Sequence, residues 1–167
     1  MKRIGRGLLY LVEWFLALPW PPPTRAFWLR RLGSTVGRKA VIHRCHFMNL
    51  EVAGFRNLAV GDGAHIGPEC LLDLTELVEI GPRASISPRV TLLTHADPGD
   101  GALKHRYPRQ TGAIQIGADA WVGAGSTILH GVEIGGSAVV GAGSLVREDV
   151  PAGSVVAGVP ARPVEDS

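Results

Sequence analysis

Aliphatic side chains recur every six residues along most of the chain. A helix needs apolar residues three and four apart and a single strand alternates every two, so neither element explains this period. Short strands that meet at a corner every six residues do explain it, because three such edges close a coil of about 18 residues that stacks on the next. The pattern therefore predicts an all-β fold, a parallel β-helix with triangular coils. The aliphatic positions are Val60, Ile66, Leu72, Ile80, Ile86, Leu92, Ile116, Val122, Ile128, Ile134, Val140 and Val146.

The positions between the aliphatic residues support the same fold. Glycine often follows the aliphatic residue directly, as at Gly61, Gly81 and Gly117, which suits a chain that turns sharply where a Cβ would obstruct it. Four residues after the aliphatic position the side chain is small in almost every repeat, for example Cys70 and Ala120. We expect the aliphatic and small side chains to fill the interior of the coils together.

This repeat resembles the hexapeptide-repeat family, [LIV]-G-x-x-[small]-x, over residues 34–164. The resemblance implies a left-handed parallel β-helix. The handedness comes from the family alone, because parallel crossovers are otherwise right-handed almost without exception. We expect a β-helical acyltransferase domain at 34–164, preceded by a helical segment at 1–33.

The helical segment is expected to hold two short helices, Leu8 to Leu18 and Thr24 to Leu32, with Thr24 as N-cap and Gly33 as C-cap. Prolines end the first apolar run well short of the roughly 20 residues that span a membrane. Glu13 interrupts that run and no cleavage motif follows it, which argues against a signal peptide.

Charge is spread unevenly along the chain. Residues 1–44 carry nine Lys or Arg and one acid, whereas the remainder carries eight basic and fourteen acidic residues. This division argues against nucleic acid as a partner and favours contact of residues 1–32 with an anionic membrane surface, unless the charges are only solvated. Six aromatic residues in the same segment fit a membrane interface, or else cap the open end of the β-helix or pack against another subunit. Both interpretations stay open at this point.

The spacing of cysteine and histidine residues argues against disulfide bonds and a metal site. Cys45 and Cys70 are far apart and form no C-x-x-C motif, so a reducing cytoplasm suits the protein. Zinc carbonic anhydrases of the γ type share this fold and carry an H-x-x-x-x-H pair, a spacing that no two histidines have here. We therefore expect no metal.

One loop, at about residues 94–115, is the longest departure from the repeat, and long loops on a rigid stack are usually functional. It opens with Thr94-His95. Together with the coil from Ile116 to Gly123 and the ending from Ala157 to Arg162, this motif resembles the galactoside, maltose and nodulation O-acetyltransferases. The same motifs also resemble those of polysaccharide O-acetyltransferases and xenobiotic acetyltransferases.

This resemblance implies an acetyl-CoA-dependent O-acetyltransferase in which His95 is the general base of a direct transfer. The acceptor would be a hydroxyl of a sugar or glycan, in polysaccharide, lipopolysaccharide or a lipid-linked intermediate. Streptogramin or chloramphenicol-type drugs as acceptors, and a non-catalytic binding subunit, are the alternatives. A loop histidine fits the chemistry because a hydroxyl attacks a thioester only when a neighbouring group takes its proton.

The resemblance also implies a homotrimer that binds coenzyme A in a groove between two subunits. Trp121, Ala124, Ala142, Arg147 and Arg162 are the positions expected to contact coenzyme A. On the acceptor side we expect Asp73, Glu76 and His105. Asp73 and Glu76 belong to a two-residue expansion of the repeat before His95, where one of them either orients the imidazole or is a solvated corner acid.

Overall fold

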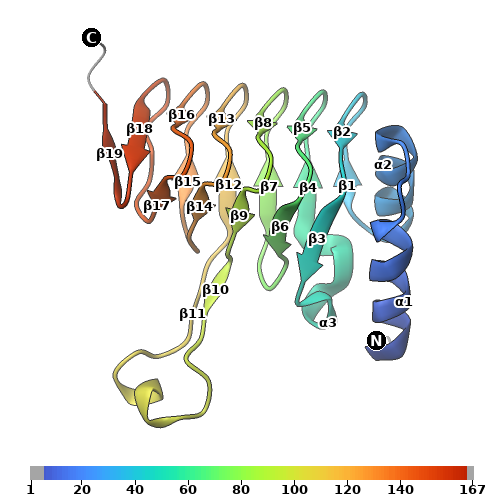
Figure 1. Cartoon of the computed structure of the whole chain (residues 1–167), viewed down its shortest axis with the longest axis horizontal. Helices are drawn as coiled ribbons and strands as arrows, with labels where there is room; N and C mark the ends of the chain where they lie inside the picture. The colour runs from blue at the N-terminus through green and yellow to red at the C-terminus, as the bar shows by residue number, and fades with distance from the viewer. Residues whose placement is uncertain (1–5, 165–167) are drawn as a thin grey trace.

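The computed structural model describes residues 6–164 and confirms the β-helix (Figure 1). Successive coils add strands to three sheets, which form the three sides of a prism and are parallel except for the antiparallel hairpin at the C-terminal end. The first sheet contains β1 (Thr35–Val36), β4 (Leu58–Val60), β7 (Val78–Ile80), β12 (Ile114–Ile116) and β15 (Glu133–Ile134). The second contains β2 (Val41–Ile42), β5 (His65–Ile66), β8 (Ser85–Ile86), β13 (Trp121–Val122), β16 (Val139–Val140), β18 (Val155–Gly158) and β19 (Ala161–Pro163). The third contains β3 (Cys45–Met48), β6 (Cys70–Asp73), β9 (Thr91–Leu92), β14 (Thr127–Ile128) and β17 (Leu145–Val146).

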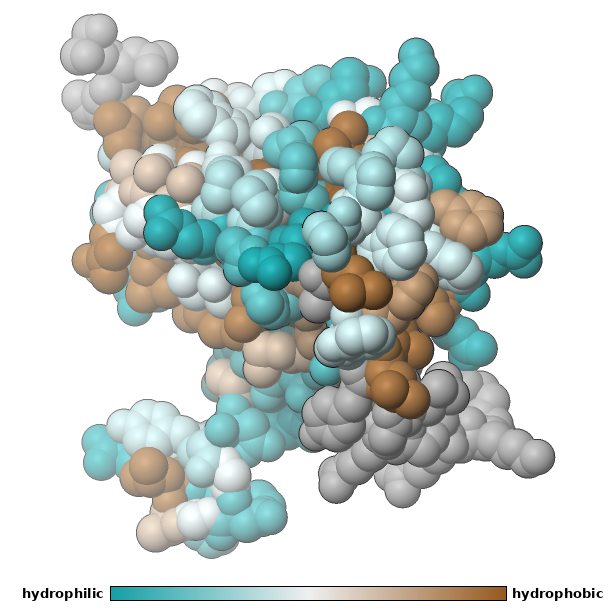
Figure 2. All heavy atoms as spheres, turned by 45° about the vertical axis from the view of Figure 1, so that its right-hand side comes forward, coloured by the Kyte–Doolittle hydropathy of each residue, from teal (hydrophilic) through white to brown (hydrophobic). Residues whose placement is uncertain are grey.

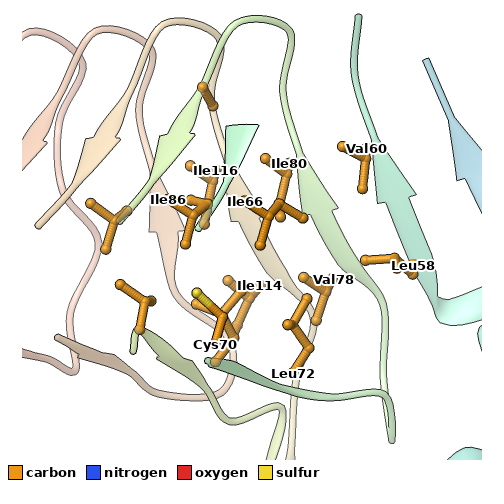
Figure 3. Packing of buried hydrophobic residues seen from close by; sticks show 14 of the residues in the cluster. Leu58, Val60, Ile66, Cys70, Leu72, Val78, Ile80, Ile86, Ile114 and Ile116 are labelled. Carbon is orange, nitrogen blue, oxygen red and sulfur yellow. The ribbon is translucent and has the colours of Figure 1, made fainter. Parts of the chain in front are cut away.

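The repeat sets the register between coils. Ile116 pairs with Ile134, one 18-residue coil further along the chain, and Val122 pairs with Val140 in the same way. The aliphatic residues point into the prism and stack on one another, as Figure 3 shows for residues such as Ile66 and Ile86. Both of these are buried, and burying such a side chain stabilises the fold by roughly 1.5–3 kcal/mol.

The glycines that follow the aliphatic residues allow close stacking of coils. A Cβ at Gly117 would lie 2.4 Å from the backbone nitrogen of Gly136, in the next coil. The left-handed backbone that turns the chain lies two residues after this glycine, at Asp119 with φ of 60°. A Cβ would obstruct these positions, as expected, but the interpretation of these glycines as turning residues is wrong. They are needed because the backbones of successive coils touch there.

Two helices, α1 (Arg6–Ala17) and α2 (Pro22–Arg31), cover one end of the prism (Figure 1). Leu16 and Leu29 are buried against the first coil. The predicted N-cap at Thr24 is wrong: the N-cap is Pro21, and the helix begins at Pro22 because proline lacks the N–H that a first turn leaves unpaired anyway. Gly33 follows the C-cap residue with φ of 108°, as a terminating glycine does.

The N-terminal aromatic residues whose side chains the structure describes divide into two groups. Phe15 packs against Trp20 and Trp28, with ring centroids 5.1 and 5.2 Å away, so these rings cap the end of the prism. Trp14 and Phe27 are exposed. Lys2 and Arg3, part of the predicted basic segment, lie outside the described residues. Within residues 6–164, no helix is long and apolar enough to cross a membrane.

Candidate active site

Three departures from the regular coil leave the prism at the same corner, where the third sheet passes to the first. The helices α3 (Leu50–Ala53) and η1 (Gly54–Asn57) follow β3, and the two-residue expansion follows β6. After β9, the hairpin of β10 (His95–Ala96) and β11 (Gln110–Thr111) carries the long loop with η2 (Ala102–His105). Since β3, β6 and β9 are neighbours in one sheet, the three departures lie one above another.

His95 stands at the base of this loop, against the expansion of the coil beneath it. Its Nδ1 lies 2.5 Å from Oδ2 of Asp73 and 3.3 Å from Oγ1 of Thr75. The His95 side chain is 24% exposed and that of Asp73 is fully buried. Of the two alternatives for Asp73, the solvated corner acid is therefore excluded, and this acid is the one that contacts the imidazole.

The Asp73 carboxylate is surrounded by donors. Oδ1 accepts hydrogen bonds from Asn49 Nδ2 at 2.7 Å and from the Thr75 hydroxyl and amide at 2.8 and 3.1 Å. Oδ2 accepts the backbone N–H of Thr94 at 2.9 Å in addition to the contact with His95. Burial alone raises the pKa of Asp73, but the bonds from Asn49, His95 and Thr75 outweigh it and hold this pKa well below its ordinary value.

An ionised carboxylate bound at Nδ1 determines the tautomer of the imidazole. Asp73 keeps the proton of the neutral ring on Nδ1, which leaves Nε2 as the nitrogen that accepts a proton. A neutral histidine held in one tautomer beside a buried acid is the arrangement expected of a general base.

Of the other residues predicted on the acceptor side, Glu76 lies beside this pair and His105 lies further out on the loop. Glu76 belongs to the same expansion and donates its backbone N–H to Thr94 Oγ1 at 3.1 Å. His105 lies in η2, on the exposed outer part of the loop. The loop stands away from the body of the molecule (Figure 2). Contact of Asp73, Glu76 and His105 with an acceptor stays a prediction.

The residues expected to bind coenzyme A fall into two groups. Ala124 and Ala142 lie on successive coils at the corner between the second and third sheets, where Gly143 N–H donates to Ala124 O at 2.9 Å. Trp121 lies in β13, just before this corner, is 53% exposed, and donates Nε1–H to Ser87 Oγ. Within one chain, the third sheet separates this group from the corner that carries His95.

Arg147 and Arg162 form the second group. Both lie near Glu148, whose Oε1 is 3.3 Å from Arg147 Nε and 3.8 Å from Arg162 Nη1. Arg147 directly follows β17, so it belongs to the same corner of the prism as His95, on a later coil. The structure thus places the two arginines near each other, as a shared role in phosphate binding requires.

Sequence reasoning missed Asn49 and Thr75. Asn49 contacts Asp73 because stacked coils bring together residues 24 positions apart, whereas Thr75 contacts it locally, two positions further along the same expansion. The helices between Leu50 and Asn57 were also not predicted. The only indication of these helices in the sequence is a break in the six-residue period before Leu58. Among the described residues, no group of three or more His, Cys, Asp or Glu side chains could hold a metal ion.

Known proteins are similar to this chain in sequence and in fold. Residues 113–148 match the family model of the bacterial transferase hexapeptide (six repeats). Nodulation protein L of Rhizobium meliloti is 36% identical over 151 residues, which cover 81% of each chain. Galactoside O-acetyltransferase of Lactococcus lactis is 32% identical over 143 residues, covering 83% of this chain and 67% of that one.

Solved structures extend the comparison. A hexapeptide-repeat acetyltransferase of Vibrio cholerae, in complex with acetyl coenzyme A, superposes with a TM-score of 0.81 at 25% identity, covering 96% of this chain and 85% of that one. A maltose O-acetyltransferase of Clostridium difficile superposes with a TM-score of 0.79 at 25% identity, covering 96% and 84%. These relatives establish the left-handed β-helix. The chain therefore belongs to the hexapeptide-repeat acetyltransferase family, in the branch that contains nodulation protein L and galactoside O-acetyltransferase.

Proposed function

We propose that the protein transfers an acetyl group from acetyl coenzyme A to a hydroxyl of a sugar or glycan, with His95 as the general base. The observation that carries this proposal is the contact of 2.5 Å between His95 Nδ1 and the buried Asp73 carboxylate. It leaves Nε2 to take the hydroxyl proton. Relatives named for galactoside and maltose support a sugar as the acceptor.

The transfer is a direct displacement. As the acceptor oxygen attacks the thioester carbonyl, its proton passes to His95 Nε2 and a carbon–oxygen bond forms. The carbon–sulfur bond then breaks, and the proton is returned to the coenzyme A sulfur. Positioned base catalysis of this kind contributes roughly 10²- to 10⁴-fold in rate. Neither cysteine takes part, because Cys45 and Cys70 are buried in the core.

The proposed active unit is a homotrimer. The corner with Trp121, Ala124 and Ala142 and the corner with His95 lie at opposite edges of the third sheet, so a site that uses both draws one corner from each of two copies. The projecting loop supports this arrangement, since Leu103 and Tyr107 are 57% and 54% exposed within one chain. Cyclic contacts between copies would cover these side chains.

A screen for acceptors tests the function. Purified protein is mixed with acetyl coenzyme A and sugars, nucleotide sugars, a streptogramin or chloramphenicol, and the released thiol is measured. We expect release with a carbohydrate, and loss of it in His95→Gln but not in His46→Gln, an exposed histidine paired with Glu69. Release with only the antibiotics would favour drug modification. Release with none of the acceptors would refute the proposal.

We also propose that the helical end contacts an anionic membrane surface from the cytoplasmic side, which suits a lipid-linked acceptor. Leu11 and Trp14 on α1 are 63% and 66% exposed, and the Arg31 guanidinium lies 5.6 Å from the Phe27 ring centroid. One of the basic residues is not available for this contact, because Arg25 is buried against backbone carbonyls.

Flotation with anionic vesicles tests this contact. Deleting residues 1–32 would uncover the prism, since Leu16 and Leu29 are buried, so point changes are preferable. We expect Leu11→Ser with Trp14→Ser to abolish flotation and Leu103→Ser on the loop to leave it unchanged. Flotation that survives the double change, or wild-type protein that does not float, would rule the membrane contact out.

A further inference from the structure

Asn49 approaches the candidate base through Asp73. Its Nδ2 donates to Asp73 Oδ1 at 2.7 Å, the shortest of the three bonds that this oxygen accepts. The backbone of Asn49 is left-handed, with φ of 60° and ψ of 34°, at the start of α3. Asparagine adopts this conformation more readily than most residues. Both the backbone and the side chain of Asn49 thus suit this position.

The stacking of coils brings Asn49 to Asp73. Met48 pairs with Asp73 in the third sheet, and Leu74 N–H donates to Met48 O at 3.0 Å. A second asparagine, Asn57, donates Nδ2–H to the carbonyls of Leu74 and Thr75 at 3.0 and 3.1 Å. The segment from Asn49 to Asn57 therefore holds the expansion at two points: Asn49 binds the carboxylate and Asn57 binds the backbone beside it.

The two carboxylate oxygens of Asp73 have separate tasks. Oδ2 receives His95 and the amide of Thr94, whereas Oδ1 receives Asn49 and both donors of Thr75. Fixing Oδ1 fixes the rotation of the carboxylate about its Cβ–Cγ bond, and this rotation decides where Oδ2 points. A base is efficient only when such supporting groups hold its geometry.

We infer that Asn49 is a positioning residue, which holds the Asp73 carboxylate so that Oδ2 is directed at His95. This inference rests on the proposed function, because it gives His95 the role of base. Its chemical requirement is specific: position 49 must supply an uncharged donor to Oδ1. An aspartate there would set two carboxylates about 2.7 Å apart, and such a pair shares one proton.

Replacing Asn49 by Asp should therefore change the titration of His95. The added charge makes the cluster of residues 49, 73 and 95 take up its first proton at a higher pH, by about one pH unit, and the His95 ring, bonded to Asp73, reports that step. The acid limb of kcat/KM should move up by the same amount. A residue that only stabilised the fold would lower the melting temperature when its donor is removed, without lowering the transfer rate of the folded protein.

The experiment follows the ring protons of His95 by NMR against pH in the full-length protein, with His95→Gln used for assignment. Asn49→Asp should shift the titration upward. Asn49→Gly keeps the left-handed backbone but removes the donor, and should lower acetyl transfer by roughly 10- to 100-fold with KM for acetyl coenzyme A unchanged. Lys39→Gly is the matched control, since Lys39 is an exposed residue with φ of 57° in the first coil.

Thr75→Val provides a second variant that preserves the shape of the side chain while removing the hydroxyl donor to Oδ1. It should lower the transfer rate in the same direction as Asn49→Gly. A His95 titration that is the same in wild type and Asn49→Asp, or a transfer rate in Asn49→Gly within twofold of Lys39→Gly, would overturn the inference. Absence of thiol release in the wild type would instead refute the proposed function, and the NMR titration would still decide the role of Asn49.

Discussion

Replacing Asp73 by Asn removes one acceptor oxygen from the centre of the site and leaves its shape unchanged. If the amide oxygen stays with the three donors at Oδ1, the new NH₂ group faces Thr94 N–H and His95 Nδ1. The imidazole then has to accept a hydrogen bond at Nδ1, which moves its own proton to Nε2. That is the wrong tautomer for a base.

These contacts set the expected losses of catalytic rate and of folding stability. The same acid-to-amide change in a histidine–aspartate triad lowers kcat about 10⁴-fold through the wrong tautomer, and we expect a loss of roughly 10³- to 10⁴-fold here. The amide of Thr94 is left as an unsatisfied buried donor, which costs about 1–3 kcal/mol of unfolding free energy. The loss of activity should therefore far exceed the loss of folded protein.

The assay compares thiol release and thermal unfolding in Asp73→Asn and in Asp62→Asn. Asp62 is an exposed acid paired with Arg38, and its replacement should leave both measurements near wild type. Nitrogen-15 shifts of the His95 ring report the tautomer directly. If Asp73→Asn kept kcat within threefold of the control, or if its imidazole kept the proton on Nδ1, the reasoning from this geometry would fail.

Three further predictions concern the fold, pH and the donor groove. Gly117→Ala should destabilise the protein by several kcal/mol in denaturant unfolding, because the added Cβ would meet backbone at 2.4 Å. Gly131→Ala, at φ of 76° with open space around its Cβ, should cost only about 1–2 kcal/mol. The pKa of Asp73 is lower in the folded than in the unfolded protein, so its ionisation stabilises the fold fully above the unfolded pKa of about 4, and this stabilisation is lost as pH falls below that value. The free energies of unfolding of wild type and Asp73→Asn should therefore converge at acid pH. Ala142→Trp should raise KM for acetyl coenzyme A at least tenfold with little change in melting temperature, as measured by initial rates and calorimetry.

The six-residue period predicts most of the fold because it acts locally. Ile116 and Ile134 occupy equivalent positions in successive coils, so their pairing follows from counting along the chain. The same count locates the loop that His95 opens, as its longest interruption, and the resemblance to known acetyltransferases then pointed to this histidine. The function of Gly117 was misjudged because its constraint comes from the coil above and not from its own turn.

The supporting groups of the site could not be predicted in this way. Asn49 reaches Asp73 across 24 residues, through a left-handed turn at a break in the repeat. The choice between Asp73 and Glu76 depended on which side chain points under the loop, and the six-residue period does not decide it. Prediction was weakest where the chain departs from its period, and the candidate chemistry lies in those segments.

Mixing two impaired variants, assayed at acetyl coenzyme A concentrations well below KM, measures the central claim most directly, namely that His95 of one copy acts on a thioester held at the Ala142 corner of another. His95→Gln and Ala142→Trp proteins are each assayed alone, then unfolded together and refolded as a mixture. Random assembly of a cyclic trimer leaves about one quarter of the sites with both residues intact, so thiol release should return to about 25% of the wild-type rate. A mixture as inactive as its two components would contradict the shared site.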